Sequence, residues 1–247
     1  MTVETISYGP HPDSEMDVHR PSVPASGVTT VLVHGGFWRD QYRRELMEPL
    51  IPSLLADGHI VVNLEYRRIG GAGAWPALLT DVAAGVDALI DVEGVDPARV
   101  VTIGHSAGGH LAVWLAGRHR IPAGSVGCDP VIRPCHAVSQ AGVLVFDDAR
   151  ASKLGRGAVD ELLGDVTHER LAAADPARLL PLGVPVTLVH GERDDTVPLA
   201  QSESWVTRAT AAGDQATLIA RDGDHYSVLI ATHPLWLDVI DAVRAAC

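Results

Sequence analysis

The sequence lacks any long hydrophobic run. No apolar stretch approaches the roughly 20 residues that a membrane-spanning helix requires. The N-terminal segment, MTVETISYGPHPDSEMDVHRP, also lacks the basic start and following apolar run of a secretory signal. We therefore expect no membrane-spanning segment and a cytoplasmic location.

Cysteine is scarce, with only Cys128, Cys135 and Cys247 in the chain. A local disulfide between Cys128 and Cys135 is geometrically conceivable, but an odd count without an export signal favours free thiols. The spacing of these cysteines matches no common zinc site. We expect neither a bound metal nor a cofactor.

Positive charge is also in short supply. The chain has 19 Lys and Arg residues against 31 Asp and Glu residues, which gives a formal net charge of −12. Nucleic acids and anionic membranes both select basic surfaces, so neither is expected as the main partner. A small neutral substrate is not excluded by this charge.

What the sequence does contain is an alternation of short apolar runs with helical patterns. Hydrophobic residues make up 47% of the 247 residues, enough for one large core. Residues 28–33 form a run rich in β-branched side chains, and 44–57 then repeats apolar residues at four-residue spacing, as a packed helix does. Gly58 follows, where a left-handed helix cap is expected.

The same reading along the chain predicts an α/β fold with a mostly parallel central sheet and helices on both faces. Strands that are apolar throughout are covered on both sides, and strand–helix alternation gives parallel pairing. Active sites in such sheets gather at the carboxyl ends of the strands. The expected strands are 28–33, 59–64, 99–103, 136–146, 184–189 and 215–220. The expected helices are 44–57, one opened by Pro76, 106–117, 157–173, 199–212 and one opened by Pro234.

One motif sits where an expected strand meets an expected helix. Gly104-His105-Ser106-Ala107-Gly108 has the pattern G-x-S-x-G, which at a strand-to-helix turn is typical of a nucleophile elbow. The sharp turn strains the backbone at Ser106 and exposes its hydroxyl. Glycines on either side avoid collisions, and the helix N-terminus behind favours developing negative charge. Ser106 is the candidate nucleophile.

A second motif, HGGFW at 34–38, ends the first expected strand. Acyl transfer places negative charge on a carbonyl oxygen, which requires fixed N–H donors. We assign these donors to the amides of Ala107, Gly36 and Phe37, although a Gly-Gly pair can also be a plain tight turn. Trp38 is a candidate wall of the substrate pocket, with a packing role as the alternative.

The remaining catalytic candidates follow two late strands. HGERDDTVP at 190–198 offers Asp194 as the acid that orients a histidine, with Asp195 as its competitor and Asp147 or Asp148 as remote options. His225 lies in the loop before the last helix. Its position after Ser106 and Asp194 gives the chain order Ser, Asp, His, which is the order expected in an α/β fold with a nucleophile elbow.

Taken together, the chain resembles the α/β-hydrolases, and within them the kynurenine formamidase-like and small esterase group. The resemblance covers nearly the whole length and rests on HGGFW, NLEYRR at 63–68, GHSAGGH at 104–110, HGERDDTVP and GDHYSV at 223–228. It implies a YGP-type turn before a short strand pair and one domain over 1–247 with a small helical cap at about 147–180. It also implies a structural role for residues 65–68.

The histidine loop departs from this group. A glycine often precedes the catalytic histidine there, whereas Asp224 precedes His225 here, and Tyr226-Ser227 follow. His34 and His105 are interpreted as structural, although His105 and Tyr226 are also candidates for the substrate pocket.

These residues predict a serine hydrolase that cleaves small ester substrates through an acyl-enzyme. The alternative is an aryl formamidase acting on the amide of N-formylkynurenine, and a remote alternative is a noncatalytic binding protein that keeps the hydrolase fold. The expected partner is a small ester or amide, and a homodimer is compatible with exposed sheet edges in this fold.

Overall fold

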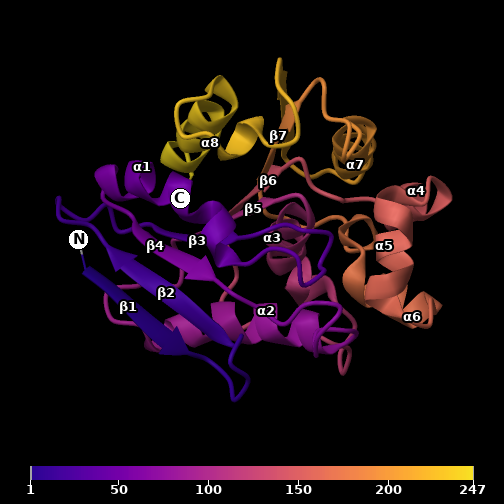
Figure 1. The fold of residues 1–247 in the computed structure, drawn as a ribbon, viewed down its shortest axis with the longest axis horizontal. Helices are drawn as coiled ribbons and strands as arrows, with labels where there is room; N and C mark the ends of the chain where they lie inside the picture. Colours follow the sequence, from indigo (N-terminus) through magenta and orange to yellow (C-terminus); the bar gives the residue numbers. More distant parts are fainter. Residues whose placement is uncertain (1, 247) are drawn as a thin grey trace.

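Among residues 2–246, which the computed structural model describes, eight strands form one central sheet (Figure 1). Their order across the sheet is β1-β2-β4-β3-β5-β6-β7-β8. Strands β3 to β8 run parallel, whereas β2 runs antiparallel to both β1 and β4. The strands are β1 Thr2–Ser7, β2 Glu15–Arg20, β3 Thr29–Val33, β4 Ile60–Leu64, β5 Val100–His105, β6 His136–Gln140, β7 Val186–Gly191 and β8 Ala216–Arg221.

The central strands are covered on both faces. Every residue of β3, β4, β5 and β7 is buried, as expected for strands that are apolar throughout. At the two edges, most of β1 is exposed and β8 is only partly buried. The predicted mostly parallel α/β sheet is confirmed.

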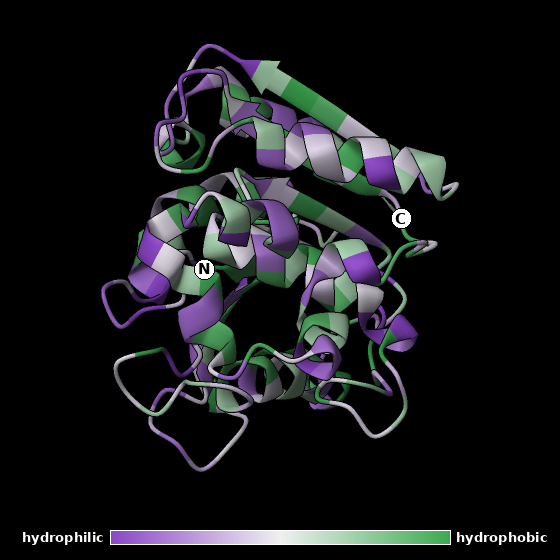
Figure 2. Cartoon of the chain, turned by 90° about the vertical axis from the view of Figure 1, so that its right-hand side faces the viewer, coloured by the Kyte–Doolittle hydropathy of each residue, from purple (hydrophilic) through white to green (hydrophobic). Residues whose placement is uncertain are grey.

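Two hydrophobic clusters lie on opposite faces of the sheet. One contains the inner faces of α1 and α8, and the other contains those of α2, α3 and α7. Figure 1 shows α1 and α8 on one side of the sheet and α2 on the other, and Figure 2 shows hydrophobic and hydrophilic residues alternating around the outer helices. The helices are α1 Ile51–Ala56, α2 Ala77–Asp87, α3 Ala107–Gly117, α4 Phe146–Ala151, α5 Leu154–Leu163, α6 His168–Ala174, α7 Ala200–Ala211 and α8 Pro234–Arg244.

The strand order reverses beside β3. The chain passes from β3 to its neighbour β4, and then returns to β5 on the other side of β3. The segments that follow β3 and β5 therefore lead to helices on opposite faces of the sheet, and such a switch point is the usual ligand position in an open α/β sheet. HGGFW and the Ser106 motif lie in these two segments.

Three expected elements differ from the prediction. In place of one helix at 157–173 there are two, α5 and α6, because Gly164 adopts a φ of 63° and ends the first. The helix expected at 44–57 is a 3-10 helix over Arg44–Leu50 followed by α1, because Pro49 lies inside it and cannot supply a helical N–H. The strand expected at 136–146 ends at Gln140. Ala141 has a φ of 51°, which is incompatible with a continuing strand, and α4 then begins at Phe146.

The entry of the chain also differs from expectation. The YGP-type turn lies between β1 and β2 rather than before a strand pair, and β2 then joins the sheet through β4. Gly58 has the predicted left-handed conformation, with a φ of 81°.

Cys128 is a free thiol, so it does not pair with Cys135. Cys135 is disulfide-bonded, which corrects the expectation of free thiols. Within residues 2–246, none of the helices combines the length and the hydrophobicity needed to cross a bilayer.

The region predicted as a cap, 147–180, holds most of α4 and all of α5 and α6, which lie together beside the carboxyl ends of the strands in Figure 1. We refer to these three helices and their connections as the cap.

Candidate active site

Ser106 occupies a strained turn between β5 and α3. Its φ of 56° and ψ of −119° lie outside the regions that L-residues favour. The turn is held by a 2.7 Å hydrogen bond from the Ser106 amide to the carbonyl of Gln140, and by the first helical bond, from the His110 amide to Ser106. The predicted strain at Ser106 is confirmed, but the expected exposure of its side chain is not, because Ser106 is only 2% exposed beneath the neighbouring loops.

The flanking glycines permit close backbone packing. A Cβ atom on Gly104 would lie 2.0 Å from the carbonyl oxygen of Gly108, and one on Gly108 would lie 2.0 Å from the carbonyl oxygen of Val33. Side chains are therefore excluded at both positions. The contact between Gly108 and Val33 brings the start of α3 against the end of β3.

The loop after β3 lies directly against the elbow. A Cβ atom on Gly35 would lie 2.9 Å from Cβ of Ser106, and the following residues all have positive φ: 117° at Gly36, 52° at Phe37 and 61° at Trp38. Within the described part of the chain, no hydrogen-bond acceptor is recorded for the amides of Gly36 and Phe37. Ala107, as the first residue of α3, likewise has no helical acceptor.

An acid–base pair lies beside the elbow. Nδ1 of His225 donates to Oδ2 of Asp194 at 2.7 Å, which leaves Nε2 as the free basic nitrogen. His105, which directly precedes Ser106, donates from Nε2 to the carbonyl oxygen of His225 at 2.9 Å, and the two rings are 4.6 Å apart. No hydrogen bond joins Ser106 Oγ to His225 among the described residues, and such bonds commonly tighten only with substrate.

Asp194, rather than its competitors, contacts the histidine. Its Oδ1 accepts hydrogen bonds from the amides of Thr196 and Val197, at 2.9 and 2.8 Å. Burial alone would raise the pKa of Asp194, but the donors around it hold that pKa well below its usual range. Asp195 bonds the Thr196 hydroxyl, Asp147 pairs with Arg178, and Asp148 pairs with Ser204 and Arg208.

A second histidine, which the sequence analysis did not single out, also contacts the acid. His190 is fully buried, and its Nε2 lies 2.9 Å from the Val197 carbonyl and 3.3 Å from Oδ2 of Asp194. A carbonyl oxygen only accepts, so Nε2 carries the proton and Ser202 Oγ donates to Nδ1 at 2.8 Å. The only sequence signal for this role is its place four residues before Asp194.

The loop that carries His225 is organised by Asp224. The Asp224 carboxylate accepts from the amides of Tyr226 and Ser227 and from the Ser227 hydroxyl, at 3.0, 2.9 and 2.8 Å. These bonds close a tight turn around His225. The aspartate that departs from the formamidase-like pattern is thus a turn-forming residue here.

The three candidate pocket residues differ in exposure. Trp38 is fully buried, donates to Nδ1 of His110 at 3.2 Å and packs edge-on against Phe146, which favours the packing role. His105 is also buried, and burial with the nearby His225 lowers its pKa to about 3, so its role is structural.

Tyr226 is the one candidate that faces solvent. It is 46% exposed and stands edge-on to His225, with ring centroids 5.3 Å apart. A hydrogen bond with Tyr42 raises the pKa of Tyr226 to about 12. Tyr42, which sequence analysis missed, packs 3.0 Å from the position of a Cβ on Gly36. Tyr226 therefore remains a candidate wall of the substrate pocket, joined there by Tyr42.

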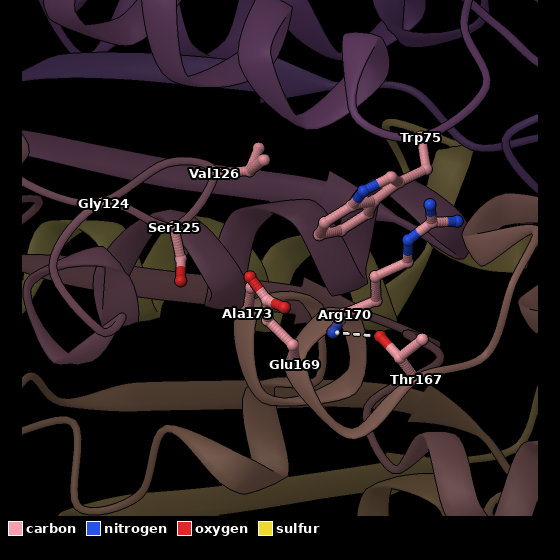
Figure 3. A pocket seen from close by; sticks show the side chains of 8 residues that line it. All are labelled: Trp75, Gly124, Ser125, Val126, Thr167, Glu169, Arg170 and Ala173. Carbon is pink, nitrogen blue, oxygen red and sulfur yellow. Dashed lines mark hydrogen bonds between the residues drawn. The ribbon is translucent and has the colours of Figure 1, made fainter.

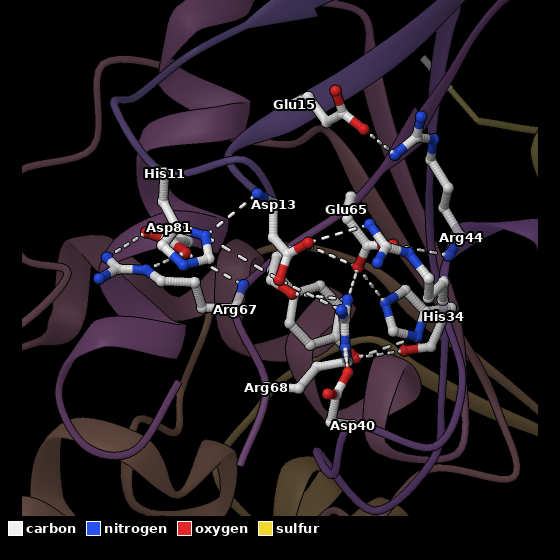
Figure 4. A network of polar contacts seen from close by, with 12 residues as sticks. His11, Asp13, Glu15, His34, Asp40, Arg44, Glu65, Arg67, Arg68 and Asp81 are labelled. Carbon is white, nitrogen blue, oxygen red and sulfur yellow. Dashed lines mark hydrogen bonds and ion pairs between the residues drawn. The ribbon is translucent and has the colours of Figure 1, made fainter. Parts of the chain in front are cut away.

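A buried charge network supports the loop after β3 (Figure 4). Oε1 of Glu65 lies 2.9 Å from Nε2 of His34 and contacts Arg68, and the Tyr66 hydroxyl donates to the His34 carbonyl at 2.7 Å. Burial alone would raise the pKa of Glu65, but the hydrogen bond with His34 and the neighbouring cation lower it to about 2. The structural role implied for residues 65–68 agrees with these contacts.

A separate pocket of about 340 Å³ lies between α6, the loop after α3 and Trp75 (Figure 3). The guanidinium carbon of Arg170 lies over the Trp75 ring, 5.6 Å from its centroid. None of Ser106, Asp194 and His225 lines this pocket. The catalytic candidates are therefore located by their mutual geometry and not by this cavity.

Comparison with known proteins identifies the family of this chain. The BD-FAE family profile matches residues 16–208, which is most of the chain. The chain belongs to the BD-FAE family. Probable carboxylic ester hydrolase LipM of Mycobacterium tuberculosis is 28% identical over 98% of this chain and 57% of its own length. Isoprenylcysteine alpha-carbonyl methylesterase ICME of Arabidopsis thaliana is 25% identical over 94% of this chain and 58% of its own.

Solved structures show the same fold. Esterase B from Lactobacillus rhamnosis superposes with a TM-score of 0.83 at 20% identity, over 99% of this chain and 85% of that one. A truncated carbohydrate esterase from gut microbiota gives 0.82 at 19% identity, over 99% and 96%. The fold of this BD-FAE member is thus the α/β-hydrolase fold. The chain spans a little over half the length of the curated relatives named above. Membership of the kynurenine formamidase-like subgroup stays a prediction.

The first prediction for this BD-FAE protein concerns Glu65. Because its folded-state pKa is about 2 against an ordinary 4.5, its stabilisation is complete above pH 4.5 and is lost as the pH falls toward 2. We expect Glu65→Gln to lower the free energy of unfolding by about 3 kcal/mol at pH 7, and by much less at pH 3. Urea unfolding at both values measures this, with exposed Glu45→Gln as the control. An equal loss at both pH values would contradict the assigned role.

The second prediction concerns His190. Replacing the imidazole with an alkyl side chain removes the ring N–H that lies 3.3 Å from Oδ2 of Asp194 and so weakens the polar surroundings of the carboxylate that holds His225. We therefore expect His190→Leu to lower kcat about tenfold or more. His190→Gln, which can still donate, should retain most of the activity. Steady-state kinetics with p-nitrophenyl acetate measure both. His136→Leu is a matched control, since His136 lies on the neighbouring strand and its ring nitrogen Nε2 bonds the Thr187 hydroxyl, away from Asp194. Equal losses for Leu and Gln would rule out a donor role.

Proposed function

We propose that this protein is a carboxylesterase-type serine hydrolase that acts on small esters. The observation that carries the proposal is the 2.7 Å bond between Asp194 and His225, held beside the strained Ser106 turn by the bond from His105. The esterases among its relatives and structural neighbours support the reaction class. The remote alternative of a noncatalytic protein is disfavoured, because no member of the triad has been lost.

In the proposed reaction, Ser106 is the nucleophile, His225 the base and Asp194 the orienting acid. His225 takes the Ser106 proton as Oγ attacks the ester carbonyl, and the amides of Ala107, Gly36 and Phe37 hold the resulting oxyanion. His225 then donates that proton to the leaving alcohol, which gives the acyl-enzyme. In the second half, His225 takes a proton from water as the water oxygen attacks the acyl carbonyl. His225 then returns that proton to Oγ of Ser106 as the acid leaves, which restores the free serine and the neutral histidine.

Aryl formamidase activity on N-formylkynurenine remains the alternative for the same triad. The named relatives cleave esters, and the loop organised by Asp224 departs from the formamidase-like pattern, so an ester is the substrate class that we propose. The expectations of a cytoplasmic location, of no nucleic-acid partner and of a homodimer stay predictions.

The third prediction tests the nucleophile. We expect Ser106→Ala to lower kcat for p-nitrophenyl acetate by about a million-fold, as triad nucleophile knockouts do, and to abolish labelling by a fluorophosphonate probe. The protein should remain folded by thermal unfolding. Activity within tenfold of wild type in a clean preparation would refute the assignment.

The fourth prediction tests the substrate class. We expect kcat/KM for p-nitrophenyl acetate to exceed that for N-formylkynurenine by at least about tenfold, with Ser106→Ala as the blank for both. The reverse preference would make the protein a formamidase and show that Asp224 and Tyr226 are compatible with that reaction.

A further inference from the structure

The proposed oxyanion loop, residues 36–39, is strained. Phe37 and Trp38 are consecutive bulky residues with φ values of 52° and 61°, a region in which L-residues with large side chains are uncommon. Such conformations persist only where the surroundings impose them, and they cluster at functional sites. Contacts with neighbouring segments must therefore hold this loop in its strained conformation.

The inner half of the loop is held by the core. Trp38 is buried and bonded to His110, and its carbonyl accepts from the amide of Ile69 at 2.8 Å. The amide of Asp40 donates back to the Ile69 carbonyl, also at 2.8 Å. These contacts fix Trp38 and the backbone after it, but none of them reaches Phe37.

The outer half is held by one turn of the cap. Residues 153–157, which we call the cap turn, include four residues of positive φ: 50° at Lys153, 56° at Gly155, 61° at Arg156 and 83° at Gly157. This left-handed turn places Gly155 directly against the Phe37 ring, so that a Cβ there would lie 2.5 Å from the ring carbons Cδ1 and Cε1.

Arg39 ties the same turn to the loop. One of its terminal nitrogens donates to the carbonyl oxygen of Gly155 at 2.9 Å, and its Nε donates to Glu161 of α5 at 2.7 Å. The loop thus touches the cap turn twice, through the ring of Phe37 and through the guanidinium of Arg39. Between these two contacts runs the strained backbone of Phe37 and Trp38.

We propose that the cap turn seats the oxyanion loop, with Gly155 and Arg39 as positioning residues that orient the amide of Phe37 toward the carbonyl oxygen of the substrate. This inference rests on the proposed function. It makes the rate of ester cleavage dependent on contact between the cap and the loop, which couples a region outside the sheet to the chemistry at Ser106.

The effect expected on kcat and KM depends on the reaction steps in which the oxyanion forms. Both acylation and deacylation pass through a tetrahedral oxyanion, so a displaced amide slows whichever step limits kcat. The donors act on the transition state and little on the bound ester, so kcat and kcat/KM should fall together. Loss of one such donor typically costs a hundredfold or more in kcat.

The glycines of the cap turn provide a matched pair of variants. Gly155→Ala and Gly157→Ala each place a methyl group on a left-handed residue of the same turn, so both carry a similar backbone penalty. Only the methyl group at 155 meets Phe37, whereas nothing lies within 4 Å of the Cβ position at 157. We expect Gly155→Ala to lower kcat for p-nitrophenyl acetate at least tenfold, with KM within about threefold, and Gly157→Ala to stay within about threefold of wild type.

Rescue separates positioning from general damage. Phe37→Ala keeps the backbone amide but removes the ring that the new methyl group would meet. The double variant Gly155→Ala/Phe37→Ala should therefore have a higher kcat than Gly155→Ala alone, a non-additive result expected only for residues in contact.

A second pair of variants tests the same proposal if Gly155→Ala fails to fold. Arg39→Gln removes the contacts to Gly155 and Glu161, and Arg150→Gln removes a comparable half-exposed ion pair, with Asp160, that lies wholly within the cap. We expect Arg39→Gln to lower kcat at least fivefold at unchanged KM, and Arg150→Gln to leave kcat within twofold. Equal kcat values within each pair would overturn the proposal.

The Ser106→Ala control distinguishes failure of the proposed cap–loop contact from failure of the proposed function. If Ser106→Ala is inactive while Gly155→Ala matches Gly157→Ala, the triad stands and the cap does not position the loop. If Ser106→Ala retains activity, the proposed function itself is wrong.

Discussion

The close approach between the first turn of α3 and the end of β3 is the constraint on which the candidate site depends. Gly108 and Gly104 carry no side chain, so the backbone after β5 can turn within a few residues and pack against Val33. The same approach brings Gly35 to Ser106. The candidate nucleophile and the proposed oxyanion loop are therefore parts of one packed unit, whose position is set by backbone contacts at the ends of the neighbouring strands β3 and β5.

Two buried carboxylates near this unit are stabilised in different ways. Glu65 contacts His34 and the permanently charged Arg68, so its negative charge is neutralised within a fixed structural network. Asp194 instead accepts hydrogen bonds from two amides and from the imidazole of His225, and Nε2 of His190 lies 3.3 Å from its Oδ2. Its charge is solvated by dipoles without being cancelled by a guanidinium, which leaves it able to stabilise the cation that forms when His225 takes a proton.

Much of this arrangement could be predicted from the sequence, because the signals are local or depend on chain order. The G-x-S-x-G turn, the apolar strands and the order of Ser106, Asp194 and His225 each require only a short motif or a position along the chain. The expected extension of the strand to 146 was wrong because an apolar run alone does not reveal the left-handed Ala141 that ends it. Pro49, which is visible in the sequence, should have limited the helix expected at 44–57.

The residues that sequence analysis missed act through contacts between distant segments. His190 matters because of its distance to Asp194 across a loop, and Tyr42 because it packs on Gly36 and bonds Tyr226. Gly155 is one of 24 glycines, and nothing in its immediate sequence indicates that it faces Phe37. Such roles depend on tertiary packing, which a single sequence does not specify at this level of detail.

The strain in the proposed oxyanion loop is the physical argument for assigning the cap a part in the proposed chemistry. Residues such as Phe37 and Trp38 cost about 1–3 kcal/mol each in a left-handed conformation. The sheet and α3 supply contacts that offset this cost at Trp38, through His110 and Ile69. At Phe37 the matching contact comes from Gly155, outside the sheet. A frame of parallel strands can place a serine and a histidine, but here it leaves one proposed oxyanion donor to be held from the cap.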